Sequence, residues 1–311
     1  NINMFNHFQN TITGWPGGKP GADDSTRPER KSPNSKRVII FSPHPDDDVV
    51  SMGGTFDRLV SQGHEVHIAY QVKGNIAVSD HDALKFIEVS KDMFKNDSKV
   101  PVSELIKELK NNKPDKIDSQ AVRDLKGFIR KREAIAATRY IGIPDSNTHF
   151  MNLPFYDTGR IKKNPPTKKD VLITASLIKK IKPHQIFAAG DLEDPHGTHK
   201  VCLDVILDAL DTLKGEKFIK DCWLWLYRGA WLDWDVHDID MAVPMSPAQV
   251  LRKRKAIFFH QTQKDGVMFQ GQDLREFWVR AEERNSETAE KYKKMGLADY
   301  AAIESFKRHY Y

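Results

Sequence analysis

A short β-branched run is followed at once by a loop that carries four ionisable side chains. Residues 37–40 read Arg-Val-Ile-Ile, a pattern typical of a buried strand, and His44 and the three aspartates at 46–48 come directly afterwards. The segment 51–63 then favours a helix that ends at a glycine. Three carboxylates beside an imidazole repel one another, and a divalent metal ion is the simplest relief of that repulsion. Taken alone, the loop is equally compatible with an acidic turn that caps the following helix.

A second loop of the same kind changes that balance. Residues 186–190 form another short apolar run, and residues 191–199 contain two histidines and three carboxylates. Ligand sites in open α/β sheets lie at the carboxyl ends of the strands, where loops far apart in sequence meet. His44, Asp47 and His199 would then form a His₂Asp ligand set with room for water, the composition of a catalytic zinc site. Iron, cobalt or nickel are the alternatives to Zn²⁺ for such ligands.

The two loops resemble the signature of a known family. His44-Pro45-Asp46-Asp47 is similar to the motif of the PIG-L/LmbE-like zinc-dependent N-acetylglucosaminide deacetylases, with Asp48 where that family usually has glutamate. The second loop, His196-Gly197-Thr198-His199, resembles the family's His-Pro-Asp-His element, with Thr198 at a commonly acidic position. The resemblance implies Zn²⁺ as cofactor and a small-molecule amino sugar as substrate.

The resemblance also implies catalytic roles for the remaining residues of the two loops. Asp46 is expected to take the proton of a metal-activated water and to deliver it to the leaving amine. His196 is expected to stabilise the tetrahedral oxyanion. Asp48 and Asp194 are expected to orient the histidine ligands.

Substrate contacts are less specific in the sequence. Arg132 lies in a strongly helical stretch, 119–142, that resembles the Arg-and-Glu-bearing helix of the deacetylase family, and it is the predicted sugar contact. Asp157, in a Tyr-Asp-Thr-Gly turn, resembles a family contact to a sugar hydroxyl. A solvated helix face and an ordinary Asx-turn are the respective alternatives. Asn75 or Ser79, after the second strand, is expected to border the pocket.

The order of elements predicts the fold class. Alternating strands and helices indicate an α/β fold, a Rossmann-like, mostly parallel sheet flanked by helices. Residues 36–311 are predicted to be a single deacetylase-like α/β domain, with residues 81–117 as an insertion of rim helices. Residues 275–311 are predicted as an additional C-terminal helical segment. Residues 1–35, which are polar and rich in glycine and proline, are predicted as a linker or N-terminal arm of turns and extended chain.

Composition excludes several classes of function. The 311 residues carry 48 Lys and Arg against 43 Asp and Glu, a net charge of +5 without a long basic block, so nucleic-acid binding is not implied. Cys202 and Cys222 lie in apolar contexts, which favours buried thiols in a reducing compartment. The sequence contains no apolar run of membrane-spanning length, and the predicted location is cytoplasmic. His260 is expected to approach the pocket but not to bind the metal.

The sequence and this resemblance therefore predict a zinc-dependent hydrolase that removes the acetyl group from an N-acetylglucosamine-type sugar. Free, phosphorylated, nucleotide-linked and lipid-linked forms of the sugar all stay open. A non-catalytic sugar-binding or regulatory domain of the same fold is one alternative, and a different metal-dependent hydrolase is another. The layout of the first residues resembles the junction in glucosamine-6-phosphate deaminase-like proteins that carry a family deacetylase domain at their C-terminus. A covalently fused deaminase-like domain is thus the expected partner.

Overall fold

Seven strands form one mixed sheet in the order β3-β2-β1-β4-β5-β7-β6. The computed structural model describes residues 2–22, 33–93, 102–112, 116–160, 162–194, 196–229, 231–264 and 275–311. The first five strands of that order are parallel to their neighbours, whereas β7 pairs antiparallel with both β5 and β6. The strands are β1 (Arg37–Ser42), β2 (Glu65–Tyr70), β3 (Thr148–Phe150), β4 (Gln185–Ala189), β5 (Trp223–Tyr227), β6 (Met241–Met245) and β7 (Ala302–His309). The mostly parallel α/β fold class is confirmed.

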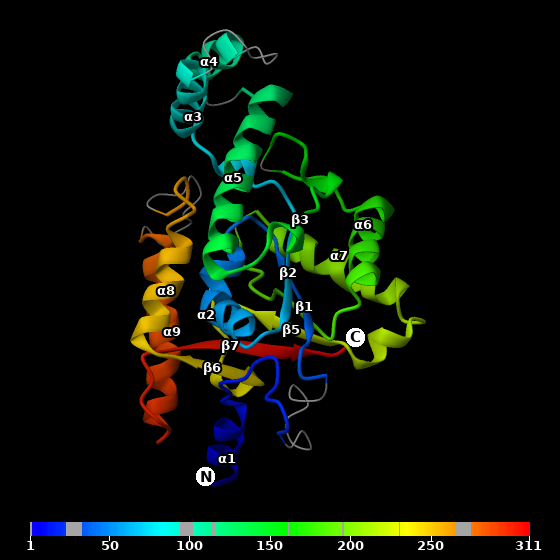
Figure 1. Ribbon diagram of the computed structural model, residues 1–311, viewed down its shortest axis with the longest axis vertical. Helices are drawn as coiled ribbons and strands as arrows, with labels where there is room; N and C mark the ends of the chain where they lie inside the picture. The colour runs from blue at the N-terminus through cyan, green and yellow to red at the C-terminus, as the bar shows by residue number, and fades with distance from the viewer. Residues whose placement is uncertain are drawn as a thin grey trace.

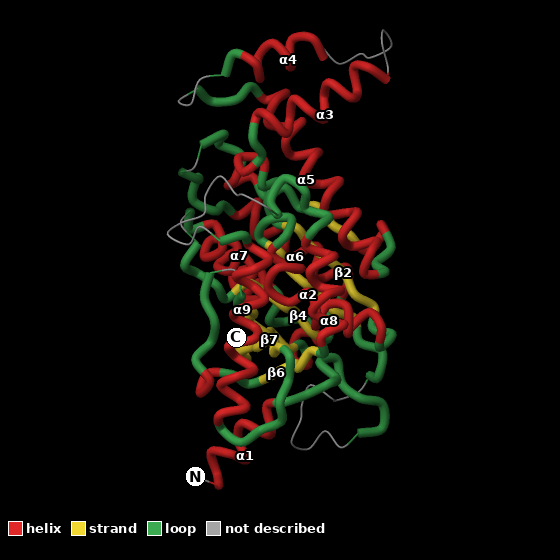
Figure 2. Tube along the Cα trace, turned by 90° about the vertical axis from the view of Figure 1, so that its left-hand side faces the viewer, coloured by secondary structure: helices red, strands yellow, loops and turns green. Residues whose placement is uncertain are grey.

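Helices cover both faces of the sheet (Figures 1 and 2). One apolar core lies between the sheet and α6 and α7, and a second lies between the sheet and α2, α5 and α8. α9 contributes residues to both cores. The bounds of these helices are α2 (Asp47–Ser61), α5 (Gln120–Ile141), α6 (Lys168–Ile181), α7 (Thr198–Thr212), α8 (Pro247–Ile257) and α9 (Phe277–Lys294). Cys202 and Cys222 are free and buried, as their apolar contexts predicted.

The order of the strands locates the ligand-binding edge. β1 and β4 are hydrogen-bonded neighbours, but the chain leaves β1 toward β2 on one side and leaves β4 toward β5 on the other. Such a switch in direction opens a crevice at the carboxyl ends of the two strands. Both loops singled out by the sequence begin there, so the sheet brings them together across 140 or more residues of chain.

The predicted insertion is a pair of helices with its own small core. α3 (Asp80–Met93) and α4 (Val102–Lys110) pack against the outer part of α5, at the top of Figure 1. The shared apolar side chains form a cluster separate from the two main cores. Lys126 on α5 fixes the base of this pair, because its Nζ lies 2.7 Å from Asp80 Oδ1 and 2.8 Å from Asp118 Oδ2.

The C-terminal segment differs from its prediction. Helix α9 forms as expected, but the last residues are the eight-residue strand β7 rather than a helix. β7 lies between β5 and β6, so it is interior to the sheet. Glu304 interrupts the apolar pattern of this strand, yet it is fully buried because Lys253 pairs with it at 2.8 Å. Lys253, on α8, thus compensates the charge of Glu304 inside the sheet. The local sequence pattern of β7 gives no sign of this partner.

The N-terminal arm also differs locally from its prediction. A helix, α1 (Ile2–Thr11), stands where turns and extended chain were expected. Phe8 is buried in the core beneath α9, and Thr11 Oγ1 lies 2.8 Å from the hydroxyl of Tyr292. Ile12 then forms a β-bridge with Ala242 of β6. The part of the arm spanning 23–32 lies outside the described residues.

Candidate metal centre and substrate pocket

The loop after β1 is folded around the carboxylate of Asp47. The backbone N–H of His44 donates to Asp47 Oδ2 at 2.7 Å, and His44 Nδ1 lies 3.2 Å from the same oxygen. Asp47 is the first residue of α2, where the positive end of the helix dipole favours a carboxylate. The strand-to-helix turn therefore places an imidazole and a carboxylate side by side.

The loop after β4 places His199 opposite that pair. His199 Nδ1 lies 2.8 Å from the carbonyl oxygen of Asp191, so the Nδ1–H donates there and Nε2 remains available as a ligand atom. Asp194 accepts from the backbone N–H groups of Thr198 at 2.8 Å and His199 at 3.1 Å. Asp194 thus holds the backbone of His199 in place at the start of α7, and it does not contact the imidazole ring through either of these hydrogen bonds.

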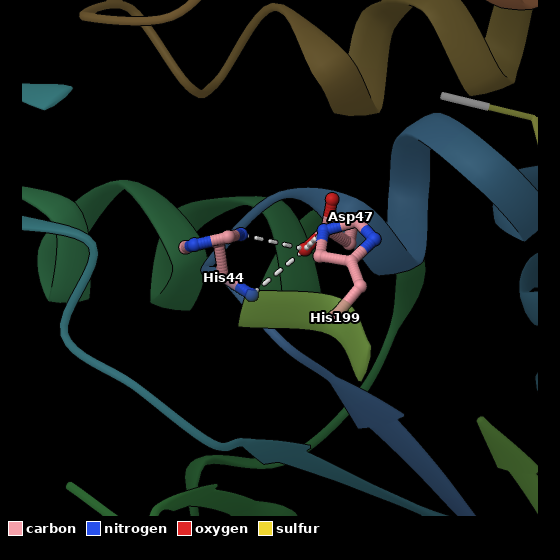
Figure 3. A group of neighbouring side chains, drawn as sticks. All are labelled: His44, Asp47 and His199. Atoms are coloured by element: carbon pink, nitrogen blue, oxygen red, sulfur yellow. Dashed lines mark hydrogen bonds and ion pairs between the residues drawn. The ribbon is translucent and has the colours of Figure 1, made fainter. Parts of the chain in front are cut away.

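The three predicted ligands converge. His199 Nε2 lies 3.2 Å from Asp47 Oδ2, and one ligand atom from each of His44, Asp47 and His199 lies within 4.8 Å of the other two (Figure 3). Two imidazole nitrogens and one carboxylate oxygen are a donor set that suits a divalent metal with an open position for water. These residues therefore fit the metal that the two loops predicted.

The charges of the cluster are strongly coupled. Burial opposes ionisation of Asp47, but the neighbouring imidazoles outweigh it and hold the pKa of this carboxyl well below its usual value. Burial likewise disfavours a charged His199, yet Asp47 raises the pKa of that imidazole to about 10. The carboxylate thus attracts positive charge, which a proton on His199 or a metal cation can supply.

Asp46 is paired with a buried arginine. Its Oδ1 lies 2.8 Å from an Nη of Arg130, a residue on α5 that is only 1% exposed. Burial raises the pKa of Asp46, and Arg130 opposes that rise. An anchored carboxyl with a raised pKa beside a metal site has the chemistry of a general base.

A pocket with an empty volume of about 490 Å³ opens over these groups. We call it the main pocket. Its walls combine the predicted polar residues with aromatic side chains contributed by the segments around β5 and α9. They are His44, Asp46, Asp47, Ala77, Arg130, Asp194, His196, His199, Trp231, Gln263 and Phe277. The predicted catalytic pair, Asp46 and His196, thus lies in the same pocket as the ligand set.

Arg132, the predicted sugar contact, lies elsewhere. Two positions along a helix correspond to a rotation of about 200°, so Arg130 and Arg132 point to nearly opposite sides of α5. Arg130 lines the main pocket, whereas Arg132 is exposed. The Arg-Lys-Arg run marked this part of α5, but choosing between its two arginines required knowing which face of the helix is buried.

Asp157 is also displaced from the site. It is exposed, and its carboxylate lies 3.7 Å from Lys73 and 3.8 Å from Arg123. These basic groups hold it on the surface next to α5, outside the residues that line the main pocket. Ser79 accepts a backbone hydrogen bond from Asp82 at 3.0 Å and so caps α3 instead of facing the pocket.

Asp48 has a different partner set from the one predicted. Ser42 Oγ donates to its Oδ1 at 3.2 Å and the hydroxyl of Tyr70 donates to its Oδ2 at 3.0 Å. Burial raises the pKa of this carboxyl to about 7. Asp48 therefore ties α2 to β1 and β2, and it supports the loop that carries His44 rather than the imidazole itself.

Several pocket residues escaped sequence analysis. Trp231 and Phe277 pack edge to face with ring centroids 5.6 Å apart and form an aromatic wall. Two backbone N–H groups, from Trp231 and Leu232, donate to Asp191 Oδ2 at 2.5 and 3.1 Å. Asp191 thus joins the aromatic wall to the ligand His199. No local motif marks this wall, because its two rings come from segments about 45 residues apart.

His260 lies deep beside the pocket. It is 1% exposed, and within the described part of the chain neither ring nitrogen has a hydrogen-bond partner. Burial, reinforced by Arg130, lowers the pKa of this imidazole to about 3. It is not one of the three residues of the His44, Asp47 and His199 group.

The fold and the two loops define a class of α/β protein with a His₂Asp centre at its switch point. The sequence model of one family, described as PIG-L, GlcNAc-PI de-N-acetylase, matches residues 39–210. That match covers more than half of the chain and includes all three ligand residues. The chain belongs to the PIG-L family of deacetylases.

Relatives extend this result. The chain is 52% identical, over 315 aligned positions and 98% of its length, to a protein of Bacteroides thetaiotaomicron named glucosamine-6-phosphate deaminase-like. It spans 48% of that relative, so about half of the relative lies outside the match.

Solved structures show the same fold at low sequence identity. The N,N'-diacetylchitobiose deacetylase of Pyrococcus horikoshii is 18% identical, with a TM-score of 0.53 over 89% of this chain and 84% of that one. GalB of Pseudomonas putida, a 4-carboxy-2-hydroxymuconate hydratase, is 14% identical, with a TM-score of 0.53 over 89% of this chain and 97% of that one. One fold thus serves deacetylation and hydration, and the site must decide between them.

Within the described residues, none of the helices combines the length and the apolar character needed to cross a bilayer.

Proposed function

We propose that this protein is a metal-dependent amide hydrolase that removes the acetyl group from an N-acetylglucosamine-type sugar. One observation carries the proposal: Asp46 is held by Arg130 at 2.8 Å beside the converging His44, Asp47 and His199, inside one pocket. A zinc ion on these three residues would lower the pKa of a bound water and polarise the amide carbonyl. The family match to a de-N-acetylase supports the reaction class.

The chain's own residues supply the proton transfers. Asp46 takes one proton from the water whose oxygen bonds to the carbonyl carbon. The carbon–nitrogen bond then breaks, and Asp46 returns the proton to the nitrogen, so the products are acetate and the free amine. Arg130 keeps the carboxylate oriented between these two events. His196, which lines the same pocket, donates a hydrogen bond to the carbonyl oxygen as negative charge develops on it.

The shape of the main pocket suits a sugar. The aromatic wall of Trp231 and Phe277 offers an apolar surface, while Gln263 and Arg130 supply polar groups. Concave sites that combine an apolar, aromatic wall with convergent polar groups are typical of small-molecule sites. In this proposal Arg130 and the aromatic wall replace Arg132 and Asp157 as the substrate contacts.

The rival functions fit the site less well. A sugar-binding domain has no need of a carboxyl anchored beside a metal site, yet Asp46 is anchored there. A two-metal phosphoesterase needs bridging ligands, and the other ligand group found in the described regions, Asp235, His237 and Asp238, includes two exposed side chains.

The proposal is tested by measuring acetate and amine release from N-acetylglucosamine and its 6-phosphate. Metal-stripped protein is compared with and without added zinc. Zinc-dependent release is expected, and the preferred sugar shows whether phosphate is recognised. Metal binding without acetate release from either sugar would overturn the proposed substrate class.

The catalytic role of Asp46 has its own test. Asp46→Asn removes the proton acceptor but leaves the three ligands, so zinc binding should persist while kcat falls by about 10²- to 10⁴-fold. Asp204→Asn, which alters an exposed carboxylate paired with Lys200, is the matched control. Equal turnover by the two variants would remove Asp46 from the mechanism.

A further inference from the structure

A second concavity lies at the opposite edge of the sheet from the metal centre. Its empty volume is about 640 Å³, and its wall includes Lys214, Ile219, Lys220, Arg308, Tyr310 and Tyr311. These residues come from the segment before β5 and from the end of β7, near the mark C in Figure 1. β5 runs parallel to β4, so its amino end lies away from the strand ends that carry the metal centre. We call this space the distal concavity; among the described residues it shares none with the main pocket.

Arg308 is held at the wall of the distal concavity by aromatic rings. The central carbon of its guanidinium lies 3.6 Å from the ring centroid of Trp223 and 5.5 Å from that of Tyr310. Its Nε and Nη1 atoms are covered and have no hydrogen-bond partner among the described residues, whereas Nη2 is not covered. The rings thus fix the position of a guanidinium that lacks a polar partner.

The nearby carboxylates leave this positive charge uncompensated. Asp240 accepts a hydrogen bond from the backbone N–H of Arg308 at 2.7 Å, but in the described part of the chain it forms no ion pair with the guanidinium. Burial lowers the pKa of Arg308 to about 10, so the group is still charged at neutral pH. Lys220 also has no carboxylate partner within the described ranges, whereas Lys214 pairs with Asp211 at 2.6 Å. Two uncompensated cations therefore line the distal concavity.

A phosphate monoester complements this wall in charge and in size. At pH 7 its phosphate carries about −1.5 to −2 charges and offers three acceptor oxygens, to which guanidinium and ammonium groups donate charge-assisted hydrogen bonds. Ile219 and the rings of Tyr310 and Tyr311 add apolar surface, and the Tyr311 hydroxyl is fixed by the carbonyl oxygen of Cys222 at 2.9 Å. The volume is that of a small-molecule site, so an organic group would fill space that bare phosphate leaves empty.

We propose that the distal concavity binds a small phosphate monoester, with its phosphate on Arg308 and Lys220 and its organic part against the tyrosine rings. The site goes beyond the proposed hydrolysis and does not depend on it, because the two spaces lie at opposite edges of the sheet. A ligand in the distal concavity leaves the main pocket free.

The test titrates the zinc-loaded full chain with phenyl phosphate by isothermal titration calorimetry, and with inorganic phosphate and phenol as its two parts. Phenyl phosphate is expected to bind at one site with a Kd of about 1 mM or below. Inorganic phosphate should bind at least about fivefold more weakly, because it buries no apolar surface. Phenol, which lacks the charge, should bind at least about tenfold more weakly.

Variants locate the binding. Arg308→Met keeps an apolar side chain against Trp223 but removes the charge, and it should weaken phenyl phosphate binding by at least about tenfold, the worth of one charge-assisted hydrogen bond. Lys220→Met, at an exposed position, should weaken it by about threefold and decides the matter if Arg308→Met does not fold. The matched control is Lys307→Met, the neighbouring residue, whose ammonium pairs with Asp238 and does not line the distal concavity; its Kd should stay within about twofold of the wild type.

Three outcomes overturn the inference. The first is an absence of phenyl phosphate binding, or unchanged binding in Arg308→Met. The second is a loss of binding in Arg130→Met with none in Arg308→Met, which would place the anion in the main pocket. The third is equal affinity for inorganic phosphate and phenyl phosphate, which would exclude an organic ligand. Acetate release is measured separately, so none of these results bears on the proposed hydrolysis.

Discussion

Two buried ion pairs in this protein have the same length but different surroundings. Lys253 Nζ and Glu304 Oε1 lie 2.8 Å apart, and both side chains are 0% exposed. Arg130 and Asp46 are also 2.8 Å apart, but the Asp46 side chain is 13% exposed and both residues line the main pocket. We call the first the closed pair and the second the open pair.

The closed pair is fully engaged by the protein. Glu304 accepts from the backbone N–H groups of Gly54 at 3.0 Å and Thr55 at 2.6 Å, while Lys253 also donates to Asn285 at 2.7 Å. The pair thus joins α2, α8, α9 and β7 in one network. In the open pair, the Asp46 carboxylate is partly exposed and lines the main pocket, so it can still accept a proton or a hydrogen bond from a ligand. The difference shows how a buried charge can serve either to fix a fold or to remain available for proton transfer.

Breaking the closed pair should have the largest effect. Glu304→Gln leaves the buried Lys253 ammonium without its counter-charge, and we expect the free energy of unfolding to fall by about 3–5 kcal/mol. Urea denaturation measures this loss. The control is Glu290→Gln, which alters an exposed carboxylate paired with Lys294. A loss below about 1 kcal/mol, within the range of surface pairs, would show that the closed pair does not hold the fold.

Zinc binding beside the open pair should stabilise the protein, and this effect should not depend on the closed pair. Zinc at about 100 times its dissociation constant should raise the free energy of unfolding by about 2.7 kcal/mol. The increment should disappear in His199→Ala and persist in Glu304→Gln, as measured by thermal denaturation with and without zinc. An undiminished increment in His199→Ala would place the metal elsewhere.

Breaking the open pair should act mainly on turnover. Arg130→Met removes the group that orients Asp46, and we expect kcat/KM for the acetylated sugar to fall by at least about tenfold. Arg132→Met, two positions along the same helix but exposed, should stay within about twofold of the wild type. Equal losses in the two variants would contradict the assignment of Arg130 to the pocket.

How much of the site the sequence predicts depends on how far apart along the chain its residues lie. His44, Asp46 and Asp47 are adjacent in sequence, and His196 and His199 share one turn, so local motifs identify them. Arg132 was preferred to Arg130 because both belong to one basic run and the face of α5 is set by its packing. The aromatic wall unites residues from two separate segments, and no spacing in the chain reveals it.

The elements of the fold also differ in how well local sequence patterns indicate them. The strands β1 to β5 lie between helices in regular alternation, so apolar runs and helix signals indicated a parallel sheet. β7 was missed because Glu304 makes its sequence look solvent-exposed, and α1 was missed because glycine and proline dominate the segment that follows it. Both elements make contacts with residues distant in sequence: Lys253 compensates the charge of Glu304 in the strand, and Tyr292 lies within hydrogen-bond distance of Thr11 in the helix.

The sequence by itself determined the α/β class and the family, and it predicted which residues converge in the candidate metal centre, because these side chains are grouped in short loops whose strand context is local. Only the tertiary structure decided which arginine reaches Asp46, that β7 lies inside the sheet between β5 and β6, and that two aromatic side chains form a wall of the main pocket. Those features depend on which faces are buried and on which charges are compensated from across the molecule, and burial is a property of the packed chain.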